Sequence, residues 1–206
     1  MKKLLFAALA VVCGSLYAAE ESKNIDLPSP NLKNTVTLKT ALEKRRTSRT
    51  FASRALSELD ISNLLWSAYG DNRPNGKRTV PAAMGIYSVE LYVVLPDGAY
   101  WHNRGENVLK KVCDADLRAF SDSRKMGAKA PLVLVMVVDK EAFGDRGDRY
   151  AAVEAGAIMQ NIYLYCAAYG FNTVVCGSFD GKQLAQALKL PANKYVFLTQ
   201  VVGCGK

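Results

Sequence analysis

The chain has 206 residues, half of them hydrophobic, and its 27 basic and 19 acidic side chains give a formal net charge of +8. This length suits one domain, and the apolar fraction is enough to bury a sizeable core, so we expect a compact globule. The charge excess is mild, and the basic clusters lack the interleaved aromatic residues of nucleic-acid-binding proteins, so no nucleic-acid partner is expected.

The first residues have the layout of a secretory signal peptide. Two lysines precede an apolar run over residues 4–12, and small residues follow. Because this run is too short to cross a bilayer and no later apolar run reaches about 18 residues, we expect no transmembrane segment. Residues 1–19 are therefore predicted to be a signal peptide cleaved after Ala18 or Ala19, and the protein to be exported to the periplasm. Cleavage before Cys13, which would leave a lipid anchor, is the alternative.

The next segments predict an arm and two helices. Residues 20–36 are polar and contain prolines, which indicates an extended arm that leads into a domain over residues 37–206. Apolar residues at helical spacing follow it, at Leu38, Ala41 and Leu42. A clearer helix starts at Ser57, where Asp60 completes a capping box, and ends at Gly70.

The middle of the chain predicts a hairpin and a buried strand. Residues 89–95 alternate in polarity, and a Pro-Asp-Gly turn joins them to a second strand over residues 99–103. Residues 131–139 are apolar on both faces, which is typical of a central strand covered on both sides. Between these strands we expect a helix over residues 106–120.

The last third predicts one long helix and a return to the sheet. Residues 150–169 are mostly apolar, and Gly156 inside them indicates the close approach of another backbone. A strand over residues 171–176, a helix capped by Asp180 and a final strand over residues 194–203 follow. This order of elements predicts an α+β domain with a mixed or antiparallel sheet.

The composition also limits the chemistry. His102 is the only histidine, so neither a histidine-rich metal site nor a Ser-His-Asp triad is expected, and no metal is assigned. The glycine motifs that bind dinucleotides or nucleoside triphosphates are absent. An exported protein could form disulfides, but two cysteines lie in apolar runs where they pack as small hydrophobic residues. The disulfide state therefore stays open for the cysteines outside the leader: Cys113, Cys166, Cys176 and Cys204.

The stretch "EKRRTSRTFASR", residues 43–54, concentrates five cations around hydroxyl side chains. Guanidinium groups form planar bidentate pairs with phosphate oxygens, and Thr47 and Ser48 can add hydroxyl donors. Each charge-assisted bond of this kind contributes roughly 1.5–3 kcal/mol, so two or three can hold a mononucleotide. A solvated helix end explains the same residues equally well.

A family resemblance favours the phosphate interpretation. "RRTSRTF" resembles the opening motif of the nitroreductase family of FMN-dependent enzymes, in particular of its SagB-like dehydrogenase branch. "LLWSAYGDNRPNGKRTVPAAMGIYSVELYVV" is similar to three further segments of that branch, L-L-W-A-A-x-G, P-S-A-G-A-L-Y-P and L-E-L-Y-V-V. "EAGAIMQNIYLYCAAYGFNTVVCGSFD" is similar to the family's G-x-x-x-Q-N-L helix and the V-G-x-F-D turn after it. Together these pieces cover almost the whole chain after the leader.

The resemblance implies an α+β sandwich that forms an intertwined homodimer, with FMN bound at the subunit interface. By position, the FMN phosphate, ribityl chain and pyrimidine edge would contact Arg45, Arg46, Thr47 and Arg49. The second subunit would bring to the flavin ring its residues Pro81, Ala82, Ala83 and Met84. The backbone facing flavin N5 and O4 would belong to Cys176, Gly177 and Ser178.

Two positions depart from the family pattern. Ala82 replaces the serine that follows the proline, which removes a hydroxyl donor. Cys204 replaces an arginine that the family often places after the glycine of the last strand, so Lys206 is the nearby cation that remains for the phosphate. We therefore expect weaker phosphate binding than is usual in the family.

These inferences predict an exported FMN-dependent oxidoreductase. Its electrons would come from NAD(P)H or from a redox partner in the cell envelope, and would pass to a small, flat, electron-poor acceptor such as a nitroaromatic or a quinone. Because the flavin carries the redox chemistry, no catalytic side chain is assigned. Specificity is expected in two loops, residues 71–80 and 121–130. The alternatives are a SagB-like FMN dehydrogenase that oxidises a small or peptide heterocycle, and a flavin-binding protein without catalysis.

Overall fold

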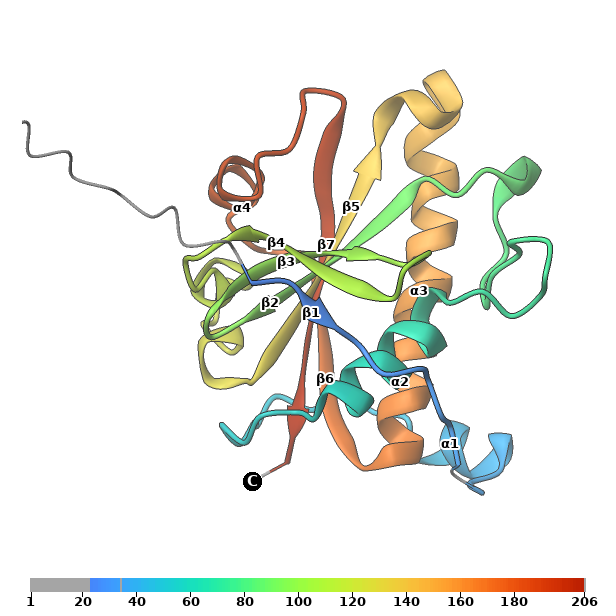
Figure 1. Cartoon of the computed structure of the whole chain (residues 1–206), viewed down its shortest axis with the longest axis vertical. Helices are drawn as coiled ribbons and strands as arrows, with labels where there is room; N and C mark the ends of the chain where they lie inside the picture. Colours follow the sequence, from blue (N-terminus) through green and yellow to red (C-terminus); the bar gives the residue numbers. More distant parts are fainter. Residues whose placement is uncertain (1–22, 34, 206) are drawn as a thin grey trace, which may run out of the picture.

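The computed structural model describes residues 23–33 and 35–205; the predicted signal peptide and Lys206 lie outside this part of the chain. Within it, the fold is a seven-stranded antiparallel sheet with strand order β1-β4-β3-β2-β5-β7-β6 (Figure 1). The strands are β1 (Ile25–Asp26), β2 (Val89–Leu95), β3 (Gly98–Asn103), β4 (Val108–Cys113), β5 (Leu132–Asp139), β6 (Phe171–Cys176) and β7 (Lys194–Cys204). The α-helices are α1 (Leu38–Lys44), α2 (Glu58–Tyr69), α3 (Gly147–Tyr169) and α4 (Gly181–Ala187). The α+β prediction is confirmed.

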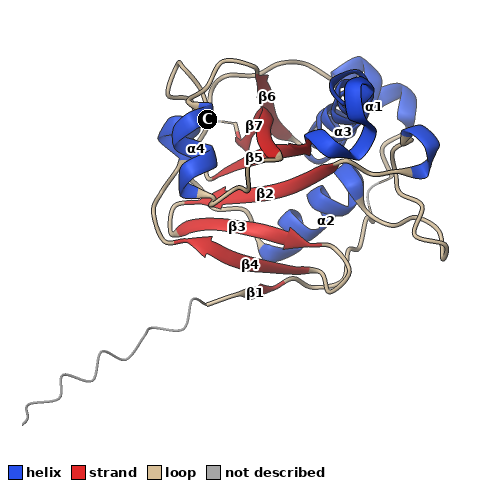
Figure 2. Cartoon of the chain, turned by 90° about the horizontal axis from the view of Figure 1, so that it is seen from above, coloured by secondary structure: helices blue, strands red, loops and turns tan. Residues whose placement is uncertain are grey.

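The sheet lies between two layers. Helices α2 and α3 cover one face, and α4 covers the other (Figure 2). The central strand β5 contributes side chains to the cores on both faces of the sheet, because alternate side chains of a strand point to opposite faces. Leu134 and Met136 join the core under α2 and α3, whereas Val133 and Val135 join the core under α4. All four are fully buried, as the apolar sequence of this strand predicts.

The two main helices begin and end largely where the sequence indicates. Ser57 Oγ accepts a hydrogen bond from the backbone N–H of Asp60, and the Asp60 carboxylate accepts one from the N–H of Ser57, so the predicted capping box is present. Helix α3 begins three residues earlier than expected, and it ends at Gly170, whose φ of 77° is the left-handed conformation of a helix C-cap. Nothing in the described chain lies within 4 Å of a Cβ built on Gly156, so the expected close approach is not made by this chain.

The predicted helix over residues 106–120 is wrong. Residues 108–113 form β4 instead, paired with β3 on one side and with β1 on the other. Asn107 adopts a φ of 54° in the turn between β3 and β4, a conformation that asparagine tolerates better than most residues. The turn directs the chain back along β3, and the hydrogen bonds of two neighbouring strands outweigh the helical spacing of the apolar residues.

The structure also bears on the disulfide state of the cysteines and on the expectation of no transmembrane segment. Cys113, Cys166, Cys176 and Cys204 are all free thiols, and all but the first are buried. In residues 23–33 and 35–205, no helix is both long enough and apolar enough to span a bilayer.

Candidate cofactor-binding site

The cationic segment that follows α1 lies along the open edge of the sheet. Helix α1 ends at Lys44, and the chain then runs beside β6, the last strand in the sheet order. The backbone N–H of Ser48 donates to the Thr173 carbonyl at 3.0 Å, and that of Ala52 donates to the Cys204 carbonyl at 2.9 Å. The side chain of Asn172 donates to the Thr50 carbonyl at 2.8 Å. The segment is thus fixed to the sheet rather than being a loose helix end.

Tyr163 of α3 links this segment to β6. Its hydroxyl accepts a hydrogen bond from the Val175 backbone N–H at 3.1 Å and lies 3.1 Å from Thr47 Oγ1. The guanidinium carbon of Arg45 lies 5.2 Å from the centre of the Tyr163 ring, within the range of a cation–π contact. Sequence reasoning did not identify Tyr163, and nothing in the helix pattern distinguishes it from Tyr165.

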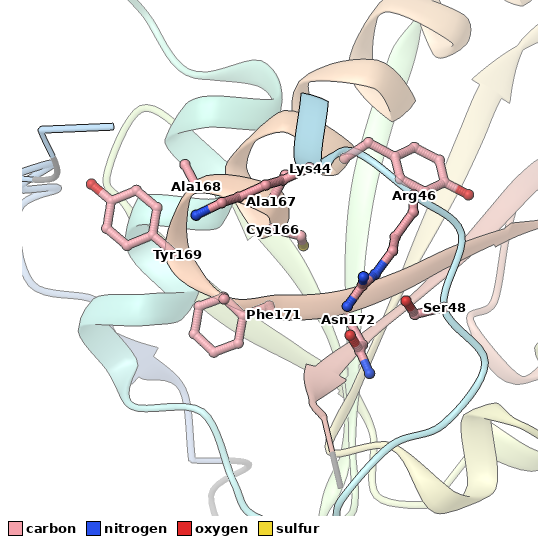
Figure 3. A pocket seen from close by; sticks show the side chains of 11 residues that line it. Lys44, Arg46, Ser48, Cys166, Ala167, Ala168, Tyr169, Phe171 and Asn172 are labelled. Atoms are coloured by element: carbon pink, nitrogen blue, oxygen red, sulfur yellow. The ribbon is translucent and has the colours of Figure 1, made fainter. Parts of the chain in front are cut away.

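The side chains of Arg46 and Ser48 line a pocket of about 510 Å³ between the segment, the end of α3 and the start of β6. In Figure 3 the Arg46 guanidinium extends toward Asn172 and Ser48, whereas the Lys44 side chain extends toward Ala168 and Tyr169. We call this space the Arg46 pocket. Its polar lining consists mainly of hydrogen-bond donors, and none of the described residues that line it is acidic. Such a donor set suits an anion with several oxygens, such as a phosphate group.

Sequence reasoning missed Asn172 and did not assign Lys44 to the site. Asparagine is unfavourable in strands, so its presence in the predicted strand over residues 171–176 was the signal that could have identified Asn172. Lys44 belongs to the cationic stretch but lies before the family motif. The structure brings both to one pocket with Arg46 and Ser48.

The other end of the site lies where β6 ends. Gly177 and Ser178 are exposed, and the Ser178 carbonyl accepts a hydrogen bond from the Ser123 N–H at 2.9 Å. This bond ties the turn to the loop over residues 121–130. The loop is organised by Asp122, whose buried carboxylate accepts hydrogen bonds from three backbone N–H groups, those of Arg124, Met126 and Gly127.

The thiol of Cys176 is neutral at physiological pH. Burial raises the pKa of Cys176 to about 11, and the Asp122 carboxylate adds to this shift. The positive charge of Arg49 lowers the pKa of Cys176, so Arg49 lies close enough to this end of the site to act on the thiol. Cys176 therefore serves as packing at the end of the strand and not as a nucleophile.

The segment from Pro81 to Met84 does not meet this site within one chain. Figure 1 shows the short turn Ala83–Gly85 (green, at the right) on the far side of α3 from the segment that follows α1 (cyan, at lower left). Met84 is 68% exposed and has a φ of 54°, which is strained for a residue other than glycine. The expected contact of this segment with a flavin thus requires a second copy of the chain.

The two departures from the family pattern have different surroundings. Cys204 is buried, and Arg54 Nη2 lies 2.9 Å from its sulfur, so a guanidinium is present at this end of β7 although residue 204 is not an arginine. Ala82 is half-buried and forms no side-chain hydrogen bond, as its methyl group requires. The predicted role of Lys206 falls outside the described residues.

The residues of the site fit the cofactor that the sequence predicts. Asn172, in the Arg46 pocket, and Cys176 are four positions apart in β6, which corresponds to about 13 Å at the usual rise of a strand. Lys44 and Arg46 line the pocket at one end, and the exposed turn of Gly177 and Ser178 lies at the other. A flavin mononucleotide likewise carries its phosphate and its ring at opposite ends.

Comparison with known proteins decides the family. The model of the nitroreductase family matches residues 42–205. The chain belongs to the nitroreductase family. It is 30% identical over 193 residues to a candidate nitroreductase of Methanocaldococcus jannaschii. The aligned region covers 87% of this chain and 96% of that protein. This nitroreductase-family chain is therefore an FMN-dependent oxidoreductase, as the sequence predicts.

Solved structures agree with this family. The crystal structure of a candidate nitroreductase from Ralstonia eutropha matches with a TM-score of 0.84 and 32% identity, over 90% of this chain and 91% of that one. The NADPH:FMN oxidoreductase of Vibrio harveyi, solved with NAD⁺, matches with a TM-score of 0.61 and 16% identity, over 82% and 68% of the two chains. At that identity the second likeness shows the fold alone.

Proposed function

We propose that FMN binds with its phosphate in the Arg46 pocket and its ring at the turn over residues 176–178. The observation that carries this proposal is the donor set of the pocket, which combines Arg46, Lys44, Ser48 and Asn172 without an acidic residue among the described lining residues. Tyr163 contacts both Arg45 and Thr47, and in this proposal these two residues would bind the ribityl chain and the pyrimidine edge. Arg49 approaches the ring end.

When bound, FMN supplies two-electron chemistry at its N5 atom. The chain provides position and electrostatics. Gly177 leaves the turn without a side chain at the ring, and the neutral thiol of Cys176 adds no negative charge beside it. The hydrogen bond between Ser123 and Ser178 couples the turn to the loop over residues 121–130, through which substrate specificity would act.

A second copy of the chain completes the site in this proposal. The outer face of α3 carries Val153, which is 64% exposed, and Gly156, which has open space above it. Met84 and Ile86 are also exposed large apolar side chains. We take these exposed apolar side chains to be part of an interface between subunits. We propose that a homodimer buries it and brings Pro81, Ala82, Ala83 and Met84 to the flavin ring of the other subunit.

The proposed reaction is electron transfer from NAD(P)H to a flat, electron-poor acceptor such as a nitroaromatic or a quinone. It is supported by family membership and by the fold shared with an NADPH:FMN oxidoreductase. We further propose that residues 1–19 direct export. In that case a redox partner in the cell envelope replaces NAD(P)H in the cell, because nicotinamide cofactors are scarce outside the cytoplasm. Fractionation followed by N-terminal sequencing tests this proposal, and an intact N-terminus in the cytoplasm contradicts it.

The absorbance spectrum of the purified protein, with and without added FMN, tests cofactor binding. Stopped-flow mixing with NADPH, followed by menadione or a nitroaromatic, then tests turnover. We expect flavin bands that bleach with the donor and return with the acceptor. A bound flavin that no donor reduces would show a flavin-binding protein without catalysis.

A further inference from the structure

A second pocket lies where two neighbouring strands separate. Hydrogen-bonded pairing of β2 with β3 extends only from Leu95 and Gly98 to Tyr92 and Trp101. Beyond these residues the start of β2 and the end of β3 diverge and leave a pocket of about 250 Å³. It shares no lining residue with the Arg46 pocket, and its walls include Arg78, Tyr87, Trp101, His102 and Arg104.

Arg78 is held in this pocket by two aromatic rings. Its guanidinium carbon lies 4.1 Å from the centre of the Tyr69 ring and 4.0 Å from that of Tyr87. The Arg78 backbone N–H donates to the Tyr87 hydroxyl at 3.0 Å, and its carbonyl accepts from Arg73 at 3.2 Å. These contacts fix the position of the side chain and cover the faces of the guanidinium group, but they leave its edge free to donate.

The guanidinium of Arg78 has no anionic partner among the described residues. None of its nitrogens forms a hydrogen bond or an ion pair there, and Nε is buried without a partner. The buried carboxylate of this region, Glu154, is bonded instead to the Tyr69 hydroxyl and to the Ser88 N–H and hydroxyl groups. Burial lowers the pKa of Arg78 because water solvates the charge poorly. The carboxylates of Glu154 and Asp71 oppose this shift, but neither forms an ion pair with the guanidinium among the described residues. Burying a cation without a direct anionic contact is costly, and the two rings offset only part of this cost.

The other walls limit the charge and size of a ligand. Arg104 forms an ion pair with Asp71 and adds a second cation to the pocket. His102 is neutral, because burial lowers its pKa to about 4, and its Nε2 atom has no partner in the described chain. Glu90 also lines the pocket, but Lys194 holds its carboxylate at 2.5 Å. This nearby carboxylate disfavours a dianion such as phosphate.

We propose that this pocket binds the carboxylate group of a small organic acid. The N–H groups at the edge of the Arg78 guanidinium would donate hydrogen bonds to the two carboxylate oxygens in a bidentate pair, the geometry that arginine favours. Tyr87 and Trp101 would contact a flat or apolar body. The volume is below the roughly 300–1,000 Å³ of pockets for drug-sized ligands, so the acid is small. This pocket shares no lining residue with the Arg46 pocket, where the FMN phosphate is proposed to bind.

Calorimetric titration of the flavin-loaded protein with benzoate, acetate and benzamide tests the proposal. Benzamide matches benzoate in shape but lacks its charge. We expect both carboxylates to bind and benzamide to bind at least tenfold more weakly than benzoate. Binding of benzamide as tight as that of benzoate, or binding of neither carboxylate, would overturn the proposal. This comparison uses the unmodified chain, so it does not depend on the folding of a variant.

Two variants locate the binding site. Arg78→Gln should weaken benzoate binding at least tenfold, whereas Arg149→Gln, which removes an exposed charge outside the pocket, should leave it unchanged. Visible absorbance is recorded during each titration, because a flat acid stacked on the flavin would shift the flavin bands. Benzoate that binds Arg78→Gln as tightly as the unmodified protein, with shifted flavin bands, would place the acid at the flavin and refute the proposal. If Arg78→Gln does not fold, Arg104→Gln replaces it and should weaken benzoate binding severalfold.

Discussion

Substitution of Arg46 by alanine should weaken FMN binding without affecting the binding of riboflavin. Riboflavin lacks the phosphate group, so it shares with FMN every proposed contact except those in the Arg46 pocket. A charge-assisted hydrogen bond contributes roughly 1.5–3 kcal/mol. Because Arg46 is exposed, the lower end of this range applies, and it corresponds to roughly a tenfold increase in the FMN dissociation constant. Folding should be unaffected, because the Arg46 guanidinium has no hydrogen-bond partner among the described residues.

Quenching of flavin fluorescence on titration into the flavin-free protein measures both dissociation constants. The matched control is Lys182→Ala, which removes one exposed positive charge from α4, on the opposite face of the sheet. The control separates a local contact from the general attraction of a basic protein for a phosphate. An equal loss of FMN and riboflavin affinity in Arg46→Ala would refute the placement of the phosphate, and unchanged FMN affinity would refute the pocket itself.

Three further changes test other parts of the structure. Tyr163→Phe leaves the Val175 N–H without its acceptor and should lower the free energy of unfolding by about 1–3 kcal/mol in urea denaturation. His102 has a pKa of about 4 when folded, against about 6.5 when unfolded, so stability should fall by roughly 3 kcal/mol as the pH drops from 6.5 to 4. A pH profile unchanged in His102→Gln would contradict this. Val153→Glu should give monomers in light scattering and lose FMN, whereas Lys182→Ala should remain dimeric. If Val153→Glu stays dimeric, α3 is not part of the interface.

Local sequence signals were enough to predict the features that depend on residues close together in the chain. The capping box of α2 joins residues three positions apart, so Ser57 and Asp60 could be identified from their spacing. The left-handed C-cap at Gly170 and the fully apolar run of β5 are equally local features. The motif of the cationic segment indicated the family, and the match over residues 42–205 confirms it.

The tertiary structure decided what depends on partners distant in the chain. Residues 108–113 have helical spacing, but they form a strand because β1 and β3 lie on either side of them. Arg45 and Arg46 are adjacent in sequence, yet the first lies over the ring of Tyr163 and the second lines a pocket with Asn172. No local pattern encodes the hydrogen bonds that fix this segment to α3 and β6, since they join residues more than 100 positions apart. The sequence therefore determined which chemical groups are available, and the packing of α1, α3 and β6 decided which of them share a pocket.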